Sequence, residues 1–195
     1  MDKLFLTALL MGMSVSGIHA QNATIEPTFT EWHDLQVNAV NRFATHTDFF
    51  AFAPFENLRG TKFDMKKSAN YLSLDGDWKF NWVENADQRP TDFFRTDFDD
   101  SQWKTFPVPG IWEVNGYGDP VYVNIGFAWR GNFKNNPPEV PIKENHVGSY
   151  RRTIRIPDNW DGKQVIAHFG SVTSCVYLWV NGKFVGYSED SKIGP

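Results

Sequence analysis

The sequence predicts an all-β fold, an antiparallel β sandwich, and three observations support this prediction. Apolar residues such as Trp78, Phe80 and Trp82 alternate with polar residues, which is the two-residue period of a half-buried strand. Asn181-Gly182 is the strongest short hairpin signal in the chain. Helical periodicity is almost absent. Short strands at this spacing favour two packed antiparallel sheets.

The composition is that of one domain with a substantial core. The chain has 195 residues, of which 41% are hydrophobic, and a formal net charge of -4. Its charges are scattered and form no basic stripe, so we expect no nucleic-acid partner. Aromatic residues make up 16% of the chain, and their flat apolar faces suit either a β core or the faces of sugar rings.

Residues 1–20 have the features of a secretory signal peptide. Lys3 precedes an apolar run, residues 4–11, that is too short to span a bilayer, and Ala20 offers a cleavage position. We therefore expect a periplasmic or secreted protein without a membrane span, with a buried N-terminal helix as the alternative. The single cysteine, Cys175, lies in an apolar run, which predicts an unreactive buried thiol.

Residues 21–70 lack strand periodicity and are predicted to form an irregular N-terminal arm. The arm is rich in aromatic residues, which is unusual for disordered segments, so we expect it to be ordered and to lie over other structure. A short helix is expected to start at Glu31-Trp32-His33-Asp34.

The predicted sandwich occupies residues 71–195. Two strands are expected to reverse at Asp75-Gly76-Asp77, and alternation predicts further strands over 150–156 and 164–169. The run 175–180 is apolar on both faces, which predicts a strand covered on both sides and followed by the Asn181-Gly182 turn. The last strand has no evident partner, so the sandwich is expected to be incomplete at its C-terminus, with an open edge.

Residues 108–124 form the segment most suited to binding. It combines two prolines and three aromatic rings with Asn115, Asn124, Glu113 and Asp119, and no regular element tolerates so many Gly and Pro residues. Long irregular segments often carry binding residues, although a packed surface loop is the alternative.

Catalytic and metal-binding motifs are absent from the sequence: it has no nucleophile elbow, phosphate loop or zinc spacing. Asp99-Asp100 is expected to be a solvated turn. Glu189-Asp190 follows the apolar strand, where a carboxylate could reach a ligand or an ion, with a plain turn as the alternative.

Five motifs occur in a fixed order, at residues 74–80, 108–124, 137–141, 148–152 and 178–191. Together they resemble the N-terminal sugar-binding domain of glycoside hydrolase family 2, and specifically that of the large β-galactosidases. Upstream, Glu31-Trp32 and Asn41-Arg42 resemble the segment that leads into this domain in the same enzymes.

The resemblance implies a jelly-roll β sandwich, of the galactose-binding-domain type, at the N-terminal end of a β-galactosidase. In the family this domain is followed by an immunoglobulin-like domain and a (β/α)8 barrel, whose two glutamates carry out retaining hydrolysis of terminal β-galactosides. This chain is thus expected to hold no catalytic residue and to be inactive alone. The full-length protein is expected to be a homo-oligomer.

The resemblance also implies two substrate-binding residues. Asn124 matches the asparagine that projects into the galactose site, and Asp190 matches the aspartate that contacts the sugar and binds a sodium ion. An amide can donate to and accept from adjacent hydroxyls, and hard cations prefer oxygen ligands. A magnesium ion is implied in the catalytic part. Val123 and the longer loop over residues 127–133 depart from the family pattern.

Two alternatives remain open at this point. One is a stand-alone carbohydrate-binding module. The other is the same domain of a β-glucuronidase or a β-mannosidase.

Overall fold

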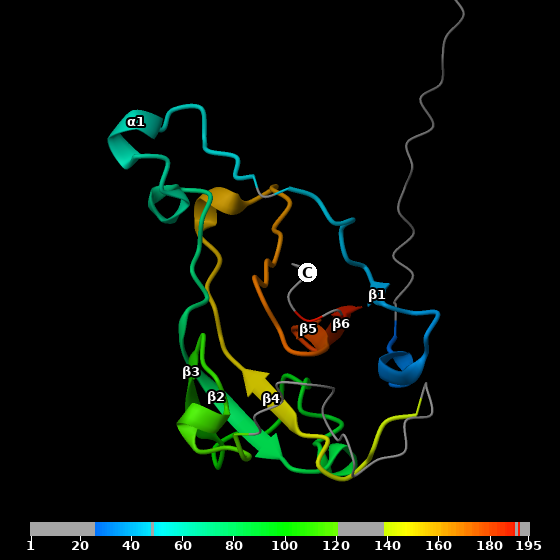
Figure 1. Ribbon diagram of the computed structural model, residues 1–195. Coiled ribbons are helices and arrows are strands. Elements are labelled where there is room, and N and C mark those ends of the chain that lie inside the picture. The colour runs from blue at the N-terminus through cyan, green and yellow to red at the C-terminus, as the bar shows by residue number, and fades with distance from the viewer. Residues whose placement is uncertain (1–25, 48, 121–138, 190, 192–195) are drawn as a thin grey trace, which may run out of the picture.

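The computed structural model describes residues 26–47, 49–120, 139–189 and 191. Within these residues the fold is all-β, with two three-stranded antiparallel sheets of order β1-β6-β5 and β3-β2-β4 (Figure 1). The strands are β1 Ala39–Val40, β2 Gly76–Val83, β3 Lys104–Val108, β4 Val147–Arg151, β5 Val176–Val180 and β6 Lys183–Ser188. The predicted antiparallel all-β class is therefore confirmed.

Where the structure describes the chain, helical structure is confined to single turns. The α-helix α1 spans Leu58–Thr61, and the 3-10 helices are Glu31–His33, Met65–Lys67, Ala86–Gln88, Glu113–Asn115 and Asp158–Trp160. The short helix expected at Glu31 is thus present. In the described part of the chain, no helix is long and apolar enough to cross a membrane.

The β3-β2-β4 sheet buries the alternating aromatic face of β2. Phe80 is 2% exposed, and its ring lies 4.6 Å from the ring of Phe106 on β3 and 4.7 Å from that of Tyr150 on β4, centroid to centroid. On the opposite face, Asp77 and Lys79 are exposed. The two-residue period of this segment therefore separates core from solvent as predicted.

The reversal predicted at Asp75-Gly76-Asp77 is wrong. Gly76 is instead the first residue of β2, where it pairs with Val108 of β3. The carbonyl of Leu74 accepts hydrogen bonds from Trp78 Nε1 at 2.9 Å and from Arg152 Nη1 at 2.6 Å. Side chains, and not a strand ladder, therefore satisfy the carbonyl of Leu74.

The β5-β6 hairpin forms at the predicted turn. Asn181 and Gly182 have φ values of 51° and 79°, the left-handed conformation that a two-residue turn of this kind requires, and Val180 pairs with Lys183. A register shift between Leu178 and Trp179 interrupts the ladder. The expectation that this strand is covered on both sides holds only in part, because Val176 to Trp179 are half-buried and Val180 is exposed.

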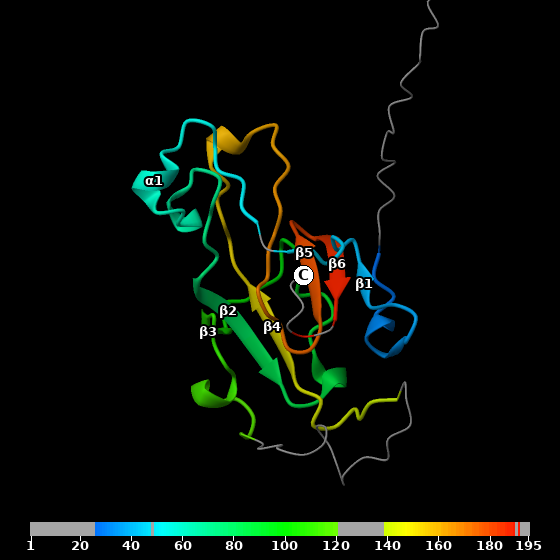
Figure 2. The same cartoon turned by 45° about the horizontal axis from the view of Figure 1, so that its top comes forward.

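The arm covers part of the edge that was expected to be open beside the last strand. Ala39 pairs with Ser188 and Val40 pairs with Tyr187, so β1 extends the sheet on the side of β6 away from β5 (Figures 1 and 2). The described part of the arm therefore lies against β6. The pairing was not evident from the sequence because β1 has only two residues.

The strands predicted over 150–156 and 164–169 are wrong beyond Arg151, where β4 ends. Figures 1 and 2 show the chain running from β4 to the neighbourhood of α1 and back to β5. Ile154 is 44% exposed and Ile166 60% exposed, so alternation here buries little apolar surface. Arg152, the residue that broke the predicted pattern, donates to the carbonyls of Leu74 and Asp75.

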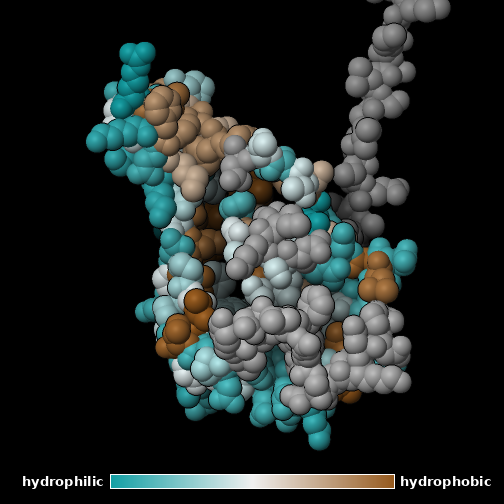
Figure 3. Space-filling model, viewed as in Figure 1, coloured by the Kyte–Doolittle hydropathy of each residue, from teal (hydrophilic) through white to brown (hydrophobic). Residues whose placement is uncertain are grey.

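Exposed apolar side chains gather around α1. Phe55 is 80% exposed and Phe63 67% exposed, and Figure 3 shows brown and tan surface in this region.

Candidate functional site

The two predicted site residues, Asn124 and Asp190, lie outside the described residues. The structure does describe the segments that lead to them. These are the first part of the 108–124 segment, the end of β6 and the arm that lies beside β6.

The described aromatic rings of the 108–124 segment pack into the core. Trp112 Nε1 donates to Tyr150 Oη at 2.6 Å, and the ring of Tyr117 lies 4.9 Å from that of Phe80. Burial raises the pKa of Tyr150, while the Trp112 hydrogen bond lowers it. Asn115 Nδ2 donates to the carbonyl of Ile111 at 2.8 Å. These contacts anchor the segment and leave Trp112 and Tyr117 with a packing role.

Backbone hydrogen bonds fix the two described residues on either side of position 190. The Glu189 N–H donates to the carbonyl of Asn38 at 3.1 Å, and the Ser191 N–H donates to the carbonyl of Ser174 at 3.2 Å. The Ser191 carbonyl accepts from the Val172 N–H at 3.1 Å. The chain is therefore held to the arm just before position 190 and to the segment before β5 just after it.

Side chains of the arm add to this attachment. Arg42 Nη1 donates to Ser188 Oγ at 2.9 Å and to the Glu189 carbonyl at 3.2 Å. Asn41 Nδ2 donates to the Val185 carbonyl at 2.7 Å, further back along β6. The motif Asn41-Arg42, for which the sequence suggested no role, thus contacts the strand that leads to Asp190.

Two tyrosine–carboxylate pairs lie beneath this region. Tyr187 Oη donates to Glu189 Oε2 at 2.7 Å, and Tyr177 Oη donates to Glu31 Oε2 at 2.9 Å. Burial is the largest influence on both tyrosines and, with the neighbouring carboxylates, raises the pKa of each. The pKa of Glu31 is lowered, so Glu31 accepts as a carboxylate and the Tyr177 bond is charge-assisted.

Glu31 is a buried carboxylate, 6% exposed, on the first turn of the arm. Burial would raise the pKa of its carboxyl, but hydrogen bonds from the backbone and from Tyr177 together hold the pKa below its ordinary value. The Thr28 N–H supplies one of these bonds, to Glu31 Oε1 at 2.7 Å. Glu31 therefore ties the arm to β5.

Cys175 lies close to the same network. Burial, and after it the charge of Glu189, raises the pKa of its thiol to about 11. The thiol is therefore almost entirely protonated at neutral pH, which is the unreactive state that the sequence predicted.

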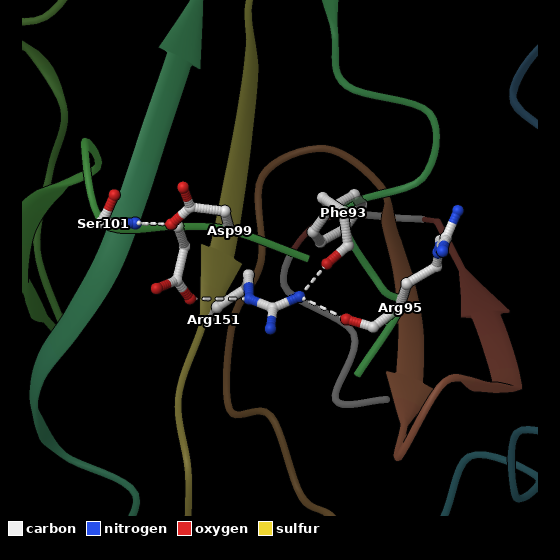
Figure 4. Close-up of polar contacts among 6 residues, drawn as sticks. Phe93, Arg95, Asp99, Ser101 and Arg151 are labelled. Atoms are coloured by element: carbon white, nitrogen blue, oxygen red, sulfur yellow. Dashed lines mark hydrogen bonds and ion pairs between the residues drawn. The ribbon is translucent and has the colours of Figure 1, made fainter. Parts of the chain in front are cut away.

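The acidic pair Asp99-Asp100 divides into two different roles (Figure 4). Asp99 is exposed and accepts from the Ser101 N–H at 2.9 Å, as expected of a turn residue. Asp100 accepts from Arg151 Nε at 2.8 Å in a half-buried ion pair, and the prediction that it is solvated is wrong. Arg151 Nη1 also donates to the carbonyls of Phe93 and Arg95, so this cluster ties the 93–101 loop to β4.

The described residues contain no group of three or more His, Cys, Asp or Glu side chains placed to hold a metal ion. The expected sodium ligand, Asp190, lies outside them. A groove of about 390 Å³ lies between the first turn of the arm and the segments 86–89 and 139–142, where Trp32, Ala86, Arg89, Val140 and Ile142 are among the residues that line it.

Comparison with known proteins identifies the family. Residues 71–195 match the model of the glycosyl hydrolases family 2 sugar binding domain. The chain is 38% identical over 164 residues to the β-galactosidase of Priestia megaterium, and 39% identical over 158 residues to that of Lactobacillus delbrueckii subsp. bulgaricus. It is 33% identical over 171 residues to the β-galactosidase large subunit of Leuconostoc lactis.

These alignments cover most of this chain but a small part of each relative. They span 84%, 81% and 81% of the chain, against 16%, 15% and 26% of the respective relatives. The antiparallel β architecture is consistent with the sandwich expected of the matched domain. The chain therefore belongs to glycosyl hydrolase family 2, and residues 71–195 are its sugar-binding domain.

Proposed function

We propose that this chain is the N-terminal part of a β-galactosidase that hydrolyses terminal β-D-galactosyl residues with retention of configuration. The observation that carries the proposal is the similarity to curated β-galactosidases, at 38% and 39% identity over more than four fifths of the chain. Those relatives are several times longer than this chain, so the proposal concerns a longer protein that contains it.

In this proposal the chain supplies the edge of the sugar pocket. Asn124 contacts galactose hydroxyls through its amide, and Asp190 accepts hydrogen bonds from the sugar and binds a sodium ion. The fixed positions of Glu189 and Ser191 support this role, because a ligand-binding side chain is effective when its backbone is held by rigid neighbours. The loop at residues 127–133, which is longer than the family pattern, is proposed to shape the aglycone side of the sugar pocket.

The proposed catalytic groups lie elsewhere in the longer protein. Two glutamates of a (β/α)8 barrel, reached through an immunoglobulin-like domain, act as acid/base and nucleophile, with a magnesium ion in that part. We propose that the longer protein is a homo-oligomer and that the 195-residue chain has no hydrolytic activity. Turnover of a galactoside by the purified chain alone would contradict this assignment.

Residues 1–20 are proposed to direct the protein to the periplasm or the medium, on the pattern of Lys3 and the apolar run after it. Fractionation of expressing cells tests this. The proposal expects the protein outside the cytoplasm and shortened at its N-terminus, and a cytoplasmic protein that retains residues 1–20 would contradict it.

The experiment that tests the proposed activity is an assay of the longer protein on matched p-nitrophenyl glycosides. We expect hydrolysis of the β-galactoside and little or none of the β-glucuronide and β-mannoside. A preference for either of the latter would keep the family and change the sugar. Binding of galactosides without hydrolysis of any substrate would identify a carbohydrate-binding module instead.

A further inference from the structure

Side-chain contacts from the arm also hold the end of β6, in addition to the hydrogen bonds of the sheet. Arg42 belongs to the arm, yet its Nη1 lies 2.9 Å from Ser188 Oγ and 3.2 Å from the Glu189 carbonyl, 146 and 147 residues away in sequence. Arg42 is half-buried, and Ser188 is 6% exposed. A guanidinium that is partly shielded from water holds such acceptors more strongly than an exposed one does.

Arg42 makes these bonds at the point where the strand pairing of β6 ends. The pairs Ala39 with Ser188 and Val176 with Ser188 are the last of their ladders, so beyond Ser188 the chain leaves regular strand pairing. After that point, the Glu189 N–H bonds to Asn38, and the Glu189 carbonyl accepts from Arg42. Ser188 Oγ, which itself accepts from Arg42, also donates to the Glu189 carbonyl, at 3.3 Å. The arm therefore contacts both the amide and the carbonyl of Glu189, and Ser188 adds a local bond to the carbonyl.

The side chain of Glu189 is directed elsewhere. Its Oε2 accepts from Tyr187 Oη at 2.7 Å, which turns the carboxylate back along β6. Tyr187 is 2% exposed, so this side chain is anchored in the core. Glu189 is thus held at its amide by Asn38, at its carbonyl by Arg42 and Ser188, and at its carboxylate by Tyr187.

We propose that Arg42 is a positioning residue for galactoside binding, which acts by holding Ser188 and Glu189, the residues that precede the proposed site residue Asp190. The inference rests on the proposed function and adds to it a residue that does not itself contact the sugar. Misplacement of a binding group by about 1 Å, even through a distant mutation, can cost up to about 100-fold in rate, so control of the backbone here has a measurable effect.

The test uses the longer protein and isopropyl β-D-thiogalactoside, which binds galactoside sites and is not hydrolysed. Arg42→Ala is expected to raise the Kd for this thiogalactoside about tenfold, equivalent to about 1.4 kcal/mol of binding free energy. KM for p-nitrophenyl β-galactoside should rise by a similar factor while kcat changes less than threefold, because the sugar contact is present in both the ground state and the transition state.

Two further variants separate positioning from a general loss of stability. Both hydrogen bonds of Arg42 are donated by the same nitrogen, Nη1. A single lysine ammonium can therefore replace it, and Arg42→Lys should recover most of the affinity that Arg42→Ala loses. Arg59→Ala makes the same substitution on the exposed surface of α1 and should leave Kd unchanged. All Kd values are measured well below the melting temperature of each variant, where the protein is fully folded.

The outcomes are distinguishable. Wild-type hydrolysis of the galactoside together with an Arg42→Ala Kd within twofold of wild type overturns the role of Arg42 and leaves the proposed function intact. An equal loss of affinity in Arg42→Ala and Arg42→Lys overturns it as well, since Lys keeps the donor. A wild-type protein that neither binds nor hydrolyses galactosides overturns both proposals.

Discussion

Phe80 lies in the buried aromatic cluster of the β3-β2-β4 sheet and is 2% exposed. Its ring contacts those of Phe106, Tyr117 and Tyr150, which come from β3, the 108–124 segment and β4. The alternation of β2 predicted that Phe80 faces inward. Its ring partners come from distant segments and could not be predicted from a two-residue period.

Phe80→Ala should lower the free energy of unfolding by about 3–5 kcal/mol, because it removes a buried ring and leaves a cavity. Urea denaturation followed by tryptophan fluorescence measures this. Phe55→Ala is the matched control, since Phe55 is 80% exposed, and its effect should stay within about 0.5 kcal/mol. Equal effects of the two substitutions would mean that Phe80 is not a core residue.

Glu31 connects the arm to β5 and makes stability depend on pH. Its pKa is held below the ordinary value in the folded protein. The folded state therefore gains stability from the ionised carboxylate above the unfolded pKa, which is about 4.3. That gain is lost as the pH falls from there through the lower folded pKa.

Glu31→Gln should remove this part of the acid sensitivity. Urea midpoints of the variant and the wild type, measured from pH 6 to pH 3, should converge as the pH falls, because the wild type alone loses the contribution of the ionised carboxylate. A constant difference between the two proteins across this range would contradict the account.

For single residues, the sequence indicated which positions are notable but not which residues they contact. The motif Asn41-Arg42 was noticeable as a resemblance, but its contacts to Val185 and Ser188 span more than 140 residues. Asp100 was expected to be solvated because neighbouring acids usually are, and its partner Arg151 lies 51 residues away. Ion pairs of this kind depend on tertiary structure, which local sequence does not encode.

At the scale of the element, the pairing of β1 with β6 is the contact that was hardest to anticipate. Gly186 on β6 is buried, and a Cβ added there would lie 2.6 Å from the carbonyl oxygen of Val40. The close approach of the arm thus requires glycine at this position.

Gly186→Ala should destabilise the protein by about 1–3 kcal/mol, because the backbone of the arm must move away. Hydrogen exchange at the Glu189 amide, which bonds to Asn38, should accelerate. Gly170→Ala is the control, since a Cβ there would meet nothing within 4 Å. If the Glu189 amide exchanges at the wild-type rate in Gly186→Ala, β1 does not depend on this close approach.

Elements were predictable where a local signal determines the structure. Asn181-Gly182 adopts left-handed φ values and forms its hairpin, and β2 follows its alternation. Residues 152–156 and 164–169 carry the same alternation without forming strands. Alternation shows that a segment can pair, but a strand also needs a neighbouring strand to pair with.

At the scale of the whole molecule, the N-terminal arm is attached to the last two strands of the described chain. It extends the sheet at β6 through β1, bonds to β5 through Glu31 and reaches the end of β6 through Arg42. The sequence resemblance indicated Asn124 and Asp190 as site residues, and the two described residues beside Asp190 are held by backbone hydrogen bonds. Their own roles remain predictions.

The central claim is that this chain forms part of a galactoside site through Asp190. The direct measurement is the sodium dependence of p-nitrophenyl β-galactoside hydrolysis by the longer protein, for wild type, Asp190→Asn and the control Asp99→Asn. Asp99 is an exposed turn residue, so its variant should behave as wild type. Asp190→Asn should show weaker hydrolysis and little response to sodium, because an amide is a poorer cation ligand than a carboxylate. Kinetics of Asp190→Asn that match wild type at every sodium concentration would contradict the claim.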